Sequence, residues 1–248
     1  MKIAVAGGTG AVGRHVVAAA RAAGHEALVL SRSTGVDLLH ADGLAERVAD
    51  ADAVIDVAGI STLSAKAAIR FFGTVTDNLI AAERAAGIPH HVALSVIGAV
   101  KTNFSYYAGK AAQEEKVMNS GTGWSLLRTT QFHEFVQQTA QRGIVAGIQV
   151  VPVMRCQPIA AAEVAAELLR IAEGAPRGME PDLAGPREED LPELVRRFVN
   201  ATGKKRLVLG IALPGAFGRA MRGGEFLPDP RTRLGALTFG QWLTAREP

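Results

Sequence analysis

Met1-Lys-Ile-Ala-Val-Ala-Gly-Gly-Thr-Gly-Ala-Val-Gly13 opens the chain, and this stretch decides the fold. Ile3, Ala4 and Val5 form a short apolar run that is typical of a buried strand, and the glycines follow it directly. Beyond them, apolar residues recur at helical spacing up to Ala20, and 27–30 is a second apolar run. The sequence therefore predicts a strand, a glycine turn, a helix and a second strand.

Such a unit presents backbone N–H groups at a helix N-terminus, where the helix dipole favours a diphosphate. Two glycine registers fit it, because Gly8, Gly10 and Gly13 read as G-x-G-x-x-G while Gly7, Gly10 and Gly13 read as G-x-x-G-x-x-G. A tight turn without a ligand is the simpler alternative. The flanking strands favour a dinucleotide site, with these contacts expected in the turn: Gly7, Thr9, Gly10, Ala11, Val12 and Gly13.

Composition narrows the class of protein. The 248 residues are 48% hydrophobic, which is enough for one large α/β domain or a domain with a small appendage. The net charge of +3 is scattered, so we expect no nucleic-acid partner, and no apolar run is long enough to predict a membrane span. The single cysteine, Cys156, excludes an intrachain disulfide, and we expect a cytoplasmic protein.

Strand-like and helix-like segments alternate along the first part of the chain. Expected strands cover 3–5, 27–30, 53–57, 91–96 and 124–128, and expected helices cover 44–50, 66–86 and 106–119. This alternation predicts a Rossmann-like, doubly wound parallel sheet over residues 1–150. A small α/β substrate cap integrated with the same domain is expected over residues 151–248, with Lys204-Lys-Arg206 as a solvated loop. Its expected strands are 148–153, 179–183 and 206–209, and its expected helices are 161–173, 188–201, 214–221 and 239–245.

The second strand ends in Ser31-Arg32-Ser33. An arginine near this position accommodates the 2′-phosphate of NADP, whereas a carboxylate would bind the ribose hydroxyl of NAD. The sequence therefore favours NADP(H), with NAD(H) as the alternative because Asp37 lies close by. The third strand is expected to bring Val57, Ala58 and Gly59 to the cofactor, since ligands bind outside the carboxyl ends of such strands.

Three polar residues further along suit carbonyl reduction. Ser95 ends the fourth strand, and Tyr106 and Lys110 are four residues apart, so they share one helix face. An ammonium group beside a tyrosine would lower its pKa and make it a useful proton donor, while a serine hydroxyl would hold the carbonyl oxygen. Packing of the aromatic ring and ribose binding by Lys110 are the alternatives, and Tyr107 is a second candidate for the acid.

At this point the sequence resembles the atypical short-chain dehydrogenase/reductase superfamily, on its NmrA-like, NAD(P)H-binding branch. The motifs that carry the resemblance span most of the chain: Gly7–Gly13, Leu30-Ser-Arg32, 90–98, Tyr106-Tyr-Ala-Gly-Lys110, 126–132, Gln157-Pro158 and Glu163-Val-Ala165. The resemblance implies a Rossmann domain that binds NADP(H), with Ser95, Tyr106 and Lys110 as the catalytic residues. It also implies that Asn78 supports the lysine and belongs to the cofactor site.

Three departures from the family pattern bear on catalysis. The interval from Ser95 to Tyr106 is slightly short, a second tyrosine follows, and the third strand ends in Asp56-Val-Ala-Gly59 instead of an asparagine-containing turn. Some relatives on this branch bind the dinucleotide and act as redox sensors without turnover. The resemblance therefore supports cofactor binding more strongly than catalysis.

The cap carries no motif with a chemical meaning of its own. Candidate residues for the substrate pocket are Tyr107, Phe132, His133 and Phe217, although core packing explains the aromatic ones equally well. His133 is interpreted as a polar residue at the pocket mouth, with a general acid/base or a substrate contact as the alternative. A metal is not expected, because no second ligand lies at zinc spacing from this histidine.

Together these features predict an NADP-dependent oxidoreductase that reduces a ketone or quinone on a small, fairly apolar molecule. The alternatives are a non-catalytic NADP(H)-binding redox sensor and a tailoring enzyme acting on an aromatic, polyketide-like substrate. We expect a small-molecule substrate, neither nucleic acid nor membrane as a partner, and a monomer or homodimer.

Overall fold

The computed structural model describes residues 1–203 and 206–245, and the expected loop residues Lys204 and Lys205 lie outside them. The chain divides into two compact units. The first holds Met1–Arg128 and Val164–Pro181, and the second holds Thr129–Glu163 and the chain from Asp182 onward. The expected boundary at residue 150 therefore does not separate these two units, because the chain returns to the first unit after Glu163.

A parallel sheet is the centre of the first unit. Its strands follow the order β5-β4-β3-β1-β2, and the short β9 pairs with β5. β1 runs parallel to both β2 and β3, with Ala4 opposite Leu28 on one side and Val54 on the other. The bounds are β1 (Lys2–Ala6), β2 (Glu26–Leu30), β3 (Ala53–Asp56), β4 (His91–Val96), β5 (Trp124–Thr129) and β9 (Gly178–Met179). This is the predicted Rossmann-like α/β fold.

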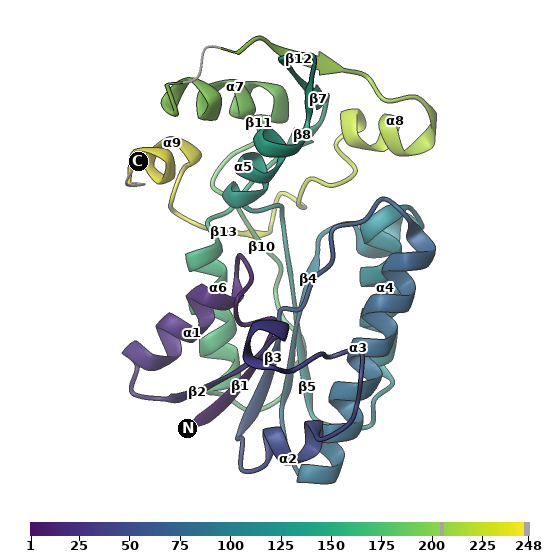
Figure 1. Cartoon of the computed structure of the whole chain (residues 1–248), viewed down its shortest axis with the longest axis vertical. Helices are drawn as coiled ribbons and strands as arrows, with labels where there is room; N and C mark the ends of the chain where they lie inside the picture. The colour runs from purple at the N-terminus through teal and green to yellow at the C-terminus, as the bar shows by residue number, and fades with distance from the viewer. Residues whose placement is uncertain (204–205, 246–248) are drawn as a thin grey trace. The chain divides into compact units, whose positions relative to one another are not determined.

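Helices cover both faces of this sheet. Figure 1 shows α1 and α6 on one side and α3 and α4 on the other. The helices are α1 (Gly13–Ala22), α2 (Leu44–Val48), α3 (Ala65–Ala86), α4 (Ser105–Met118) and α6 (Ala161–Ala172), with single 3-10 turns at Arg32–Thr34 and Ala99–Lys101. β1, β2 and β4 each lead into a helix or 3-10 turn at the carboxyl edge of the sheet, where the predicted residues Gly7–Gly13, Ser31–Ser33 and Ser95 lie.

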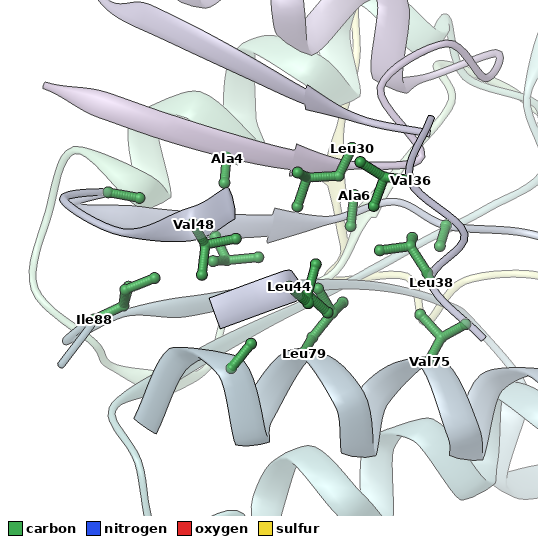
Figure 2. Packing of buried hydrophobic residues seen from close by; sticks show 14 residues of the cluster. Ala4, Ala6, Leu30, Val36, Leu38, Leu44, Val48, Val75, Leu79 and Ile88 are labelled. Atoms are coloured by element: carbon green, nitrogen blue, oxygen red, sulfur yellow. The ribbon is translucent and has the colours of Figure 1, made fainter. Parts of the chain in front are cut away.

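The apolar periodicity of the sequence accounts for the core between the sheet and α2 and α3. Leu30, Val54 and Leu79 are fully buried, and Figure 2 shows strand and helix side chains interlocking there. Ala4 and Ala6 are two residues apart on β1, so both side chains point to this face of the sheet. Burying these side chains stabilises the packing of the sheet against α2 and α3.

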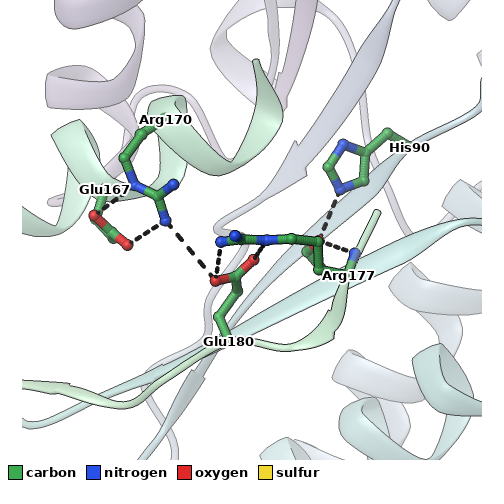
Figure 3. A network of polar contacts seen from close by, with 6 residues as sticks. His90, Glu167, Arg170, Arg177 and Glu180 are labelled. Carbon is green, nitrogen blue, oxygen red and sulfur yellow. Dashed lines mark hydrogen bonds and ion pairs between the residues drawn. The ribbon is translucent and has the colours of Figure 1, made fainter. Parts of the chain in front are cut away.

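Polar contacts attach the segment after α6 to β5. Arg177 donates through its backbone N–H to Ser125 Oγ at 3.1 Å, and its guanidinium binds Glu180 at 2.6 Å (Figure 3). Arg170 binds Glu167 at 2.8 Å and lies 3.8 Å from Glu180. These bonds and the pairing of β9 with β5 explain why residues 164–181 belong to the first unit.

The second unit consists of short elements. β12, β7 and β6 form a three-stranded sheet, β11 pairs antiparallel with β8, and β10 pairs parallel with β13. The strands are β6 (Ile144–Val145), β7 (Ile148–Pro152), β8 (Arg155–Cys156), β10 (Leu183–Ala184), β11 (Glu189–Asp190), β12 (Val208–Ile211) and β13 (Arg233–Leu234). The helices are α5 (His133–Arg142), α7 (Leu191–Ala201), α8 (Gly215–Gly223) and α9 (Phe239–Thr244).

Two of the differences from the sequence prediction have a local reason. The expected strand 179–183 is two separate strands, β9 and β10, because Pro181 between them has no N–H to donate to a ladder. The helix expected from residue 188 begins at Leu191, because the Asp190 side chain accepts from Glu193 N and caps it. Within the described residues, no helix combines the length and apolarity needed to cross a membrane.

Candidate cofactor and catalytic site

The glycine turn after β1 requires glycine on steric grounds at two positions. Gly7 has φ +78°, and a Cβ there would lie 2.8 Å from the Cα of Ala58. At Gly13 a Cβ would lie 2.2 Å from the carbonyl oxygen of Gly7, which no rotamer can relieve. Gly10 closes the turn by donating its N–H to the same oxygen at 2.9 Å. These tight approaches favour the register of Gly7, Gly10 and Gly13.

The start of α1 is free to bind an anion. Val12, its N-cap residue, makes no side-chain cap, and the first turn carries no acidic residue. In the described structure, no backbone carbonyl accepts from the N–H groups of Ala11, Val12 or Gly13. Unused donors at a helix N-terminus, beside a turn that only glycine can form, fit the diphosphate of a dinucleotide. Thr9 and Gly10 lie on the exposed side of the same turn.

Arg32 and two serines follow β2. Ser31 is buried, and its hydroxyl lies 2.9 Å from that of Ser33, which fixes the start of the 3-10 turn. The guanidinium of Arg32 is exposed and has no hydrogen-bond or ion-pair partner within residues 1–203 and 206–245. An unpaired guanidinium next to two hydroxyls fits a phosphate group.

Asn78 supports the loop beyond these residues and not the lysine. Its side-chain amide donates to the carbonyl of Leu38 at 2.9 Å. Asp37, next to Leu38, is exposed and accepts from Leu39 N at 3.1 Å. Asn78 therefore holds the segment that carries Asp37, which lies five residues after Arg32.

Lys110 is buried, and the acceptors of its hydrogen bonds lie on two elements. Its Nζ donates to the carbonyl of Leu94 on β4 at 2.8 Å and to Oε1 of Gln113 on α4 at 2.8 Å. The ammonium group also lies 4.3 Å from the ring centre of Phe72. Burial lowers the pKa of Lys110 to about 8, although Asp56 and Glu114 raise it. Gln113 thus makes the supporting contact that the resemblance assigned to Asn78.

Asp56 connects this lysine to the glycine turn. Its Oδ2 accepts from Gln113 Nε2 at 2.7 Å, and its Oδ1 accepts from Ala58 N at 2.9 Å. Ala58 is in turn the residue against which Gly7 packs. The carboxylate that holds Gln113 therefore also fixes the backbone after β3, where Val57, Ala58 and the exposed Gly59 lie.

Ser95 uses its proton within the protein. Its Oγ donates to Oε1 of Glu114 at 2.6 Å, and both residues are buried. Holding a carbonyl oxygen, as predicted from the sequence, requires that proton, so the structure differs from the expected role. The difference arises because Glu114, four residues after Lys110, lies on the same face of α4 and reaches β4.

Tyr106 packs against aromatic neighbours at the start of α4. Its ring stands edge-on to Phe72 at 5.2 Å and to Tyr107 at 6.4 Å, and Lys110 Nζ lies 5.8 Å from the ring centre. Burial, Tyr107 and Asp56 raise the pKa of Tyr106, whereas the sequence predicted that Lys110 lowers it. The burial of both groups explains the difference, because desolvation disfavours phenolate and ammonium alike.

Phe132, His133 and Phe217 belong to the second unit. His133 is 1% exposed, its Nε2 donates to the carbonyl of Leu237 at 2.9 Å, and its ring packs against Phe239 and Trp242. This is a packed position and not the pocket mouth that was expected, and burial lowers the pKa of His133. Phe132 forms a bridge with Ile159, and Phe217 packs 5.9 Å from Phe226.

Four polar residues of the first unit were not predicted from the sequence: Gln113, Glu114, Arg128, and Asp56 as a contact of Gln113. The spacing of Lys110, Gln113 and Glu114 was the available signal, because residues three and four apart share a helix face. No cluster that could hold a metal ion occurs in the described part of the chain.

The parallel sheet, the glycine turn and the free helix N-terminus define an NAD(P)-binding Rossmann protein. The chain belongs to the NAD(P)H-binding family, whose model matches residues 7–173. This match confirms the NAD(P)H-binding family that the resemblance implied, and the solved structures share the Rossmann fold that it implied. A search of curated proteins found no match.

Solved structures share the fold at low sequence identity. An NADPH-dependent quinone oxidoreductase from Escherichia coli, in complex with NADPH, is 17% identical, with 98% of each chain covered and a TM-score of 0.71. UDP-N-acetylglucosamine 4-epimerase from Bacillus cereus is 19% identical over 98% of this chain and 96% of its own, with a TM-score of 0.67. UDP-glucose 4-epimerase from Thermus thermophilus, in complex with NAD, is 19% identical over 99% and 92%, with a TM-score of 0.68.

Proposed function

We propose that the protein is an NADP(H)-dependent oxidoreductase that reduces a ketone or quinone carbonyl of a small, fairly apolar molecule. Cofactor binding follows from the family, and a bound nicotinamide cofactor supplies the hydride. Ala11, Val12 and Gly13 would hold its diphosphate. The preference for NADP(H) is supported by Arg32, whose guanidinium has no partner within the described residues.

The catalytic part of the proposal rests on the proximity of Tyr106 and Lys110. The ammonium group of Lys110 lies 5.8 Å from the centre of the Tyr106 ring. The Tyr106 phenol, whose pKa burial raises, carries a proton at neutral pH, and this proton would pass to the oxygen that becomes an alcohol. Lys110 provides a positive charge 5.8 Å from the centre of this ring.

The test compares NADPH consumption by the wild type, Tyr106→Phe and Tyr107→Phe over a panel of ketones and quinones. We expect Tyr106→Phe to lower kcat by about a hundredfold or more, because general acids contribute on this scale. A comparable loss in Tyr107→Phe alone would move the acid to Tyr107. If Tyr106→Phe reacts at the wild-type rate, the proposed acid is wrong.

A specific observation also favours the sensor function. The polar groups of Ser95 and Lys110 are satisfied by Glu114, Gln113 and the Leu94 carbonyl, as in a site that binds without turnover. A sensor would consume no NADPH with any member of the panel and would bind NADP⁺ and NADPH with different affinities. Titration calorimetry with both forms decides between these functions.

A further inference from the structure

Glu114 is an ionised carboxylate enclosed in the protein. It is fully buried, and Arg128 binds it through two bonds, Nε to Oε1 at 2.8 Å and a terminal nitrogen to Oε2 at 2.5 Å. A paired arginine and carboxylate of this geometry keep their charges. An ionised carboxylate only accepts hydrogen bonds, so any hydroxyl group that contacts Glu114 must donate to it.

That hydroxyl group is Ser95, whose Oγ lies 2.6 Å from Oε1 of Glu114. A serine hydroxyl has one proton and two lone pairs. Because the proton points to Glu114, the side chain offers only lone pairs in every other direction. A carbonyl oxygen placed against Ser95 would set two acceptors against each other, whereas a hydroxyl group would complete a hydrogen bond.

Ser95 also lies where a substrate is expected. It is near the end of β4, and ligands of such sheets bind outside the carboxyl ends of the strands. The preceding residue, Leu94, holds the Lys110 ammonium through its carbonyl group. The serine and the lysine are therefore fixed to the same strand end.

We infer that Ser95 accepts a hydrogen bond from a substrate hydroxyl group, and that Glu114 is the positioning residue that imposes this polarity. The substrate class is then a ketone that carries a free hydroxyl group, such as an α-hydroxyketone. This inference rests on the proposed function, whose substrate it narrows. A site built to bind a hydroxyl group discriminates against analogues that lack the donor.

Three probes test the inference: acetophenone, α-hydroxyacetophenone and α-methoxyacetophenone. The methoxy compound keeps the oxygen and removes the proton. We expect kcat/KM for the hydroxy compound to exceed that for the methoxy compound by about tenfold, the scale of one hydrogen bond. In Ser95→Ala this ratio should fall to about one, and most of the change should lie in KM.

Glu114→Gln tests the positioning role, because the amide can donate to Ser95 Oγ and release the serine proton. We expect the hydroxy/methoxy ratio to fall as in Ser95→Ala, while the neighbouring exposed Glu115→Gln keeps the wild-type ratio. If Glu114→Gln does not fold, Ser95→Ala alone carries the test. A wild-type ratio near one, or an unchanged ratio in Ser95→Ala, would overturn the inference.

Failure of the proposed function gives a different result. If NADPH binds and none of the probes is reduced, affinities of the three probes for the NADP⁺-loaded protein are measured by ligand-observed NMR. Tighter binding of the hydroxy compound, lost in Ser95→Ala, then supports the inference without reduction. Equal binding of all three probes contradicts it. So does a preference for the hydroxy compound that Ser95→Ala keeps.

Discussion

Gln113 joins Asp56 to Lys110. Its side-chain N–H donates to Asp56 at 2.7 Å, and its side-chain oxygen accepts from the ammonium at 2.8 Å. All three side chains are buried, and the amide is a partner of both charged groups beside the Leu94 carbonyl on Lys110 and the Ala58 N–H on Asp56. One amide on α4 therefore holds both the end of β3 and the lysine of the candidate site.

Replacing this amide by an apolar group of similar size should destabilise the protein. In Gln113→Leu both Asp56 and Lys110 lose a buried partner, and we expect the free energy of unfolding to fall by about 3 kcal/mol. Urea denaturation measures the change. Gln138→Leu, on the exposed face of α5, is the matched control and should change stability by about 0.5 kcal/mol or less. Equal changes in the two variants would show that the buried amide contributes little.

Arg32→Ala should alter the choice of cofactor. Loss of the unpaired guanidinium should weaken NADPH binding by about tenfold or more, since hydrogen bonds to charged groups contribute about 1.5–3 kcal/mol, and should leave NADH binding nearly unchanged. Dissociation constants from fluorescence titration give the comparison. Arg21→Ala, an exposed arginine at the end of α1, controls for the loss of a surface charge. An equal loss for both cofactors would remove the argument for the 2′-phosphate.

Gly13→Ala should disrupt the turn that holds the diphosphate. The new Cβ would lie 2.2 Å from the Gly7 carbonyl oxygen, so the backbone must shift. We expect a loss of about 2–3 kcal/mol in the free energy of unfolding and a large loss of NADPH affinity. At Gly223, the last residue of α8, a Cβ would meet no atom within 4 Å. Gly223→Ala should therefore keep both properties, and similar behaviour of the two variants would contradict the steric argument.

Cys156 should be unreactive in the folded protein. It is 1% exposed, and burial raises the pKa of its thiol to about 12, so the reactive thiolate is scarce near pH 8. Iodoacetamide should label the native protein at a rate orders of magnitude below that of the urea-unfolded chain. Since the chain has a single cysteine, the mass shift of the intact protein reports on this site alone. Labelling of the native protein at the unfolded rate would show that the thiol is accessible.

Local patterns were sufficient to predict much of the first unit. The glycines lie within seven residues of one another, and the strand before them and the helix after them have clear periodicities. Steric demands at Gly7 and Gly13 act between residues that are close in sequence, or between adjacent strands, so spacing alone indicates the turn. The same holds for the core of β1–β3, whose apolar runs predict burial directly.

The polar connections could not be predicted in this way. Asp56 and Gln113 are 57 residues apart, and helix spacing indicates that Gln113 and Glu114 share a face with Lys110 but not which strand they meet. The predicted roles of Ser95 and Asn78 changed because Glu114 and Leu38 are their hydrogen-bond partners. In the second unit, strands of two residues, such as β8 and β11, are too short to show any period.

Lys110 should make stability rise with pH in a defined window. Burial lowers its pKa to about 8 in the folded protein, while the unfolded chain keeps the ordinary value of 10.5. Between these values the unfolded state binds more protons than the folded state, so the free energy of unfolding increases with pH; the gain is lost as pH falls through the folded pKa. Lys110→Met removes the group and should abolish this increase. The difference between wild type and Lys110→Met is measured by urea denaturation between about pH 7.5 and about pH 9, below the range in which tyrosines titrate. A difference that does not change over this interval would mean that the folded pKa of Lys110 is not lowered.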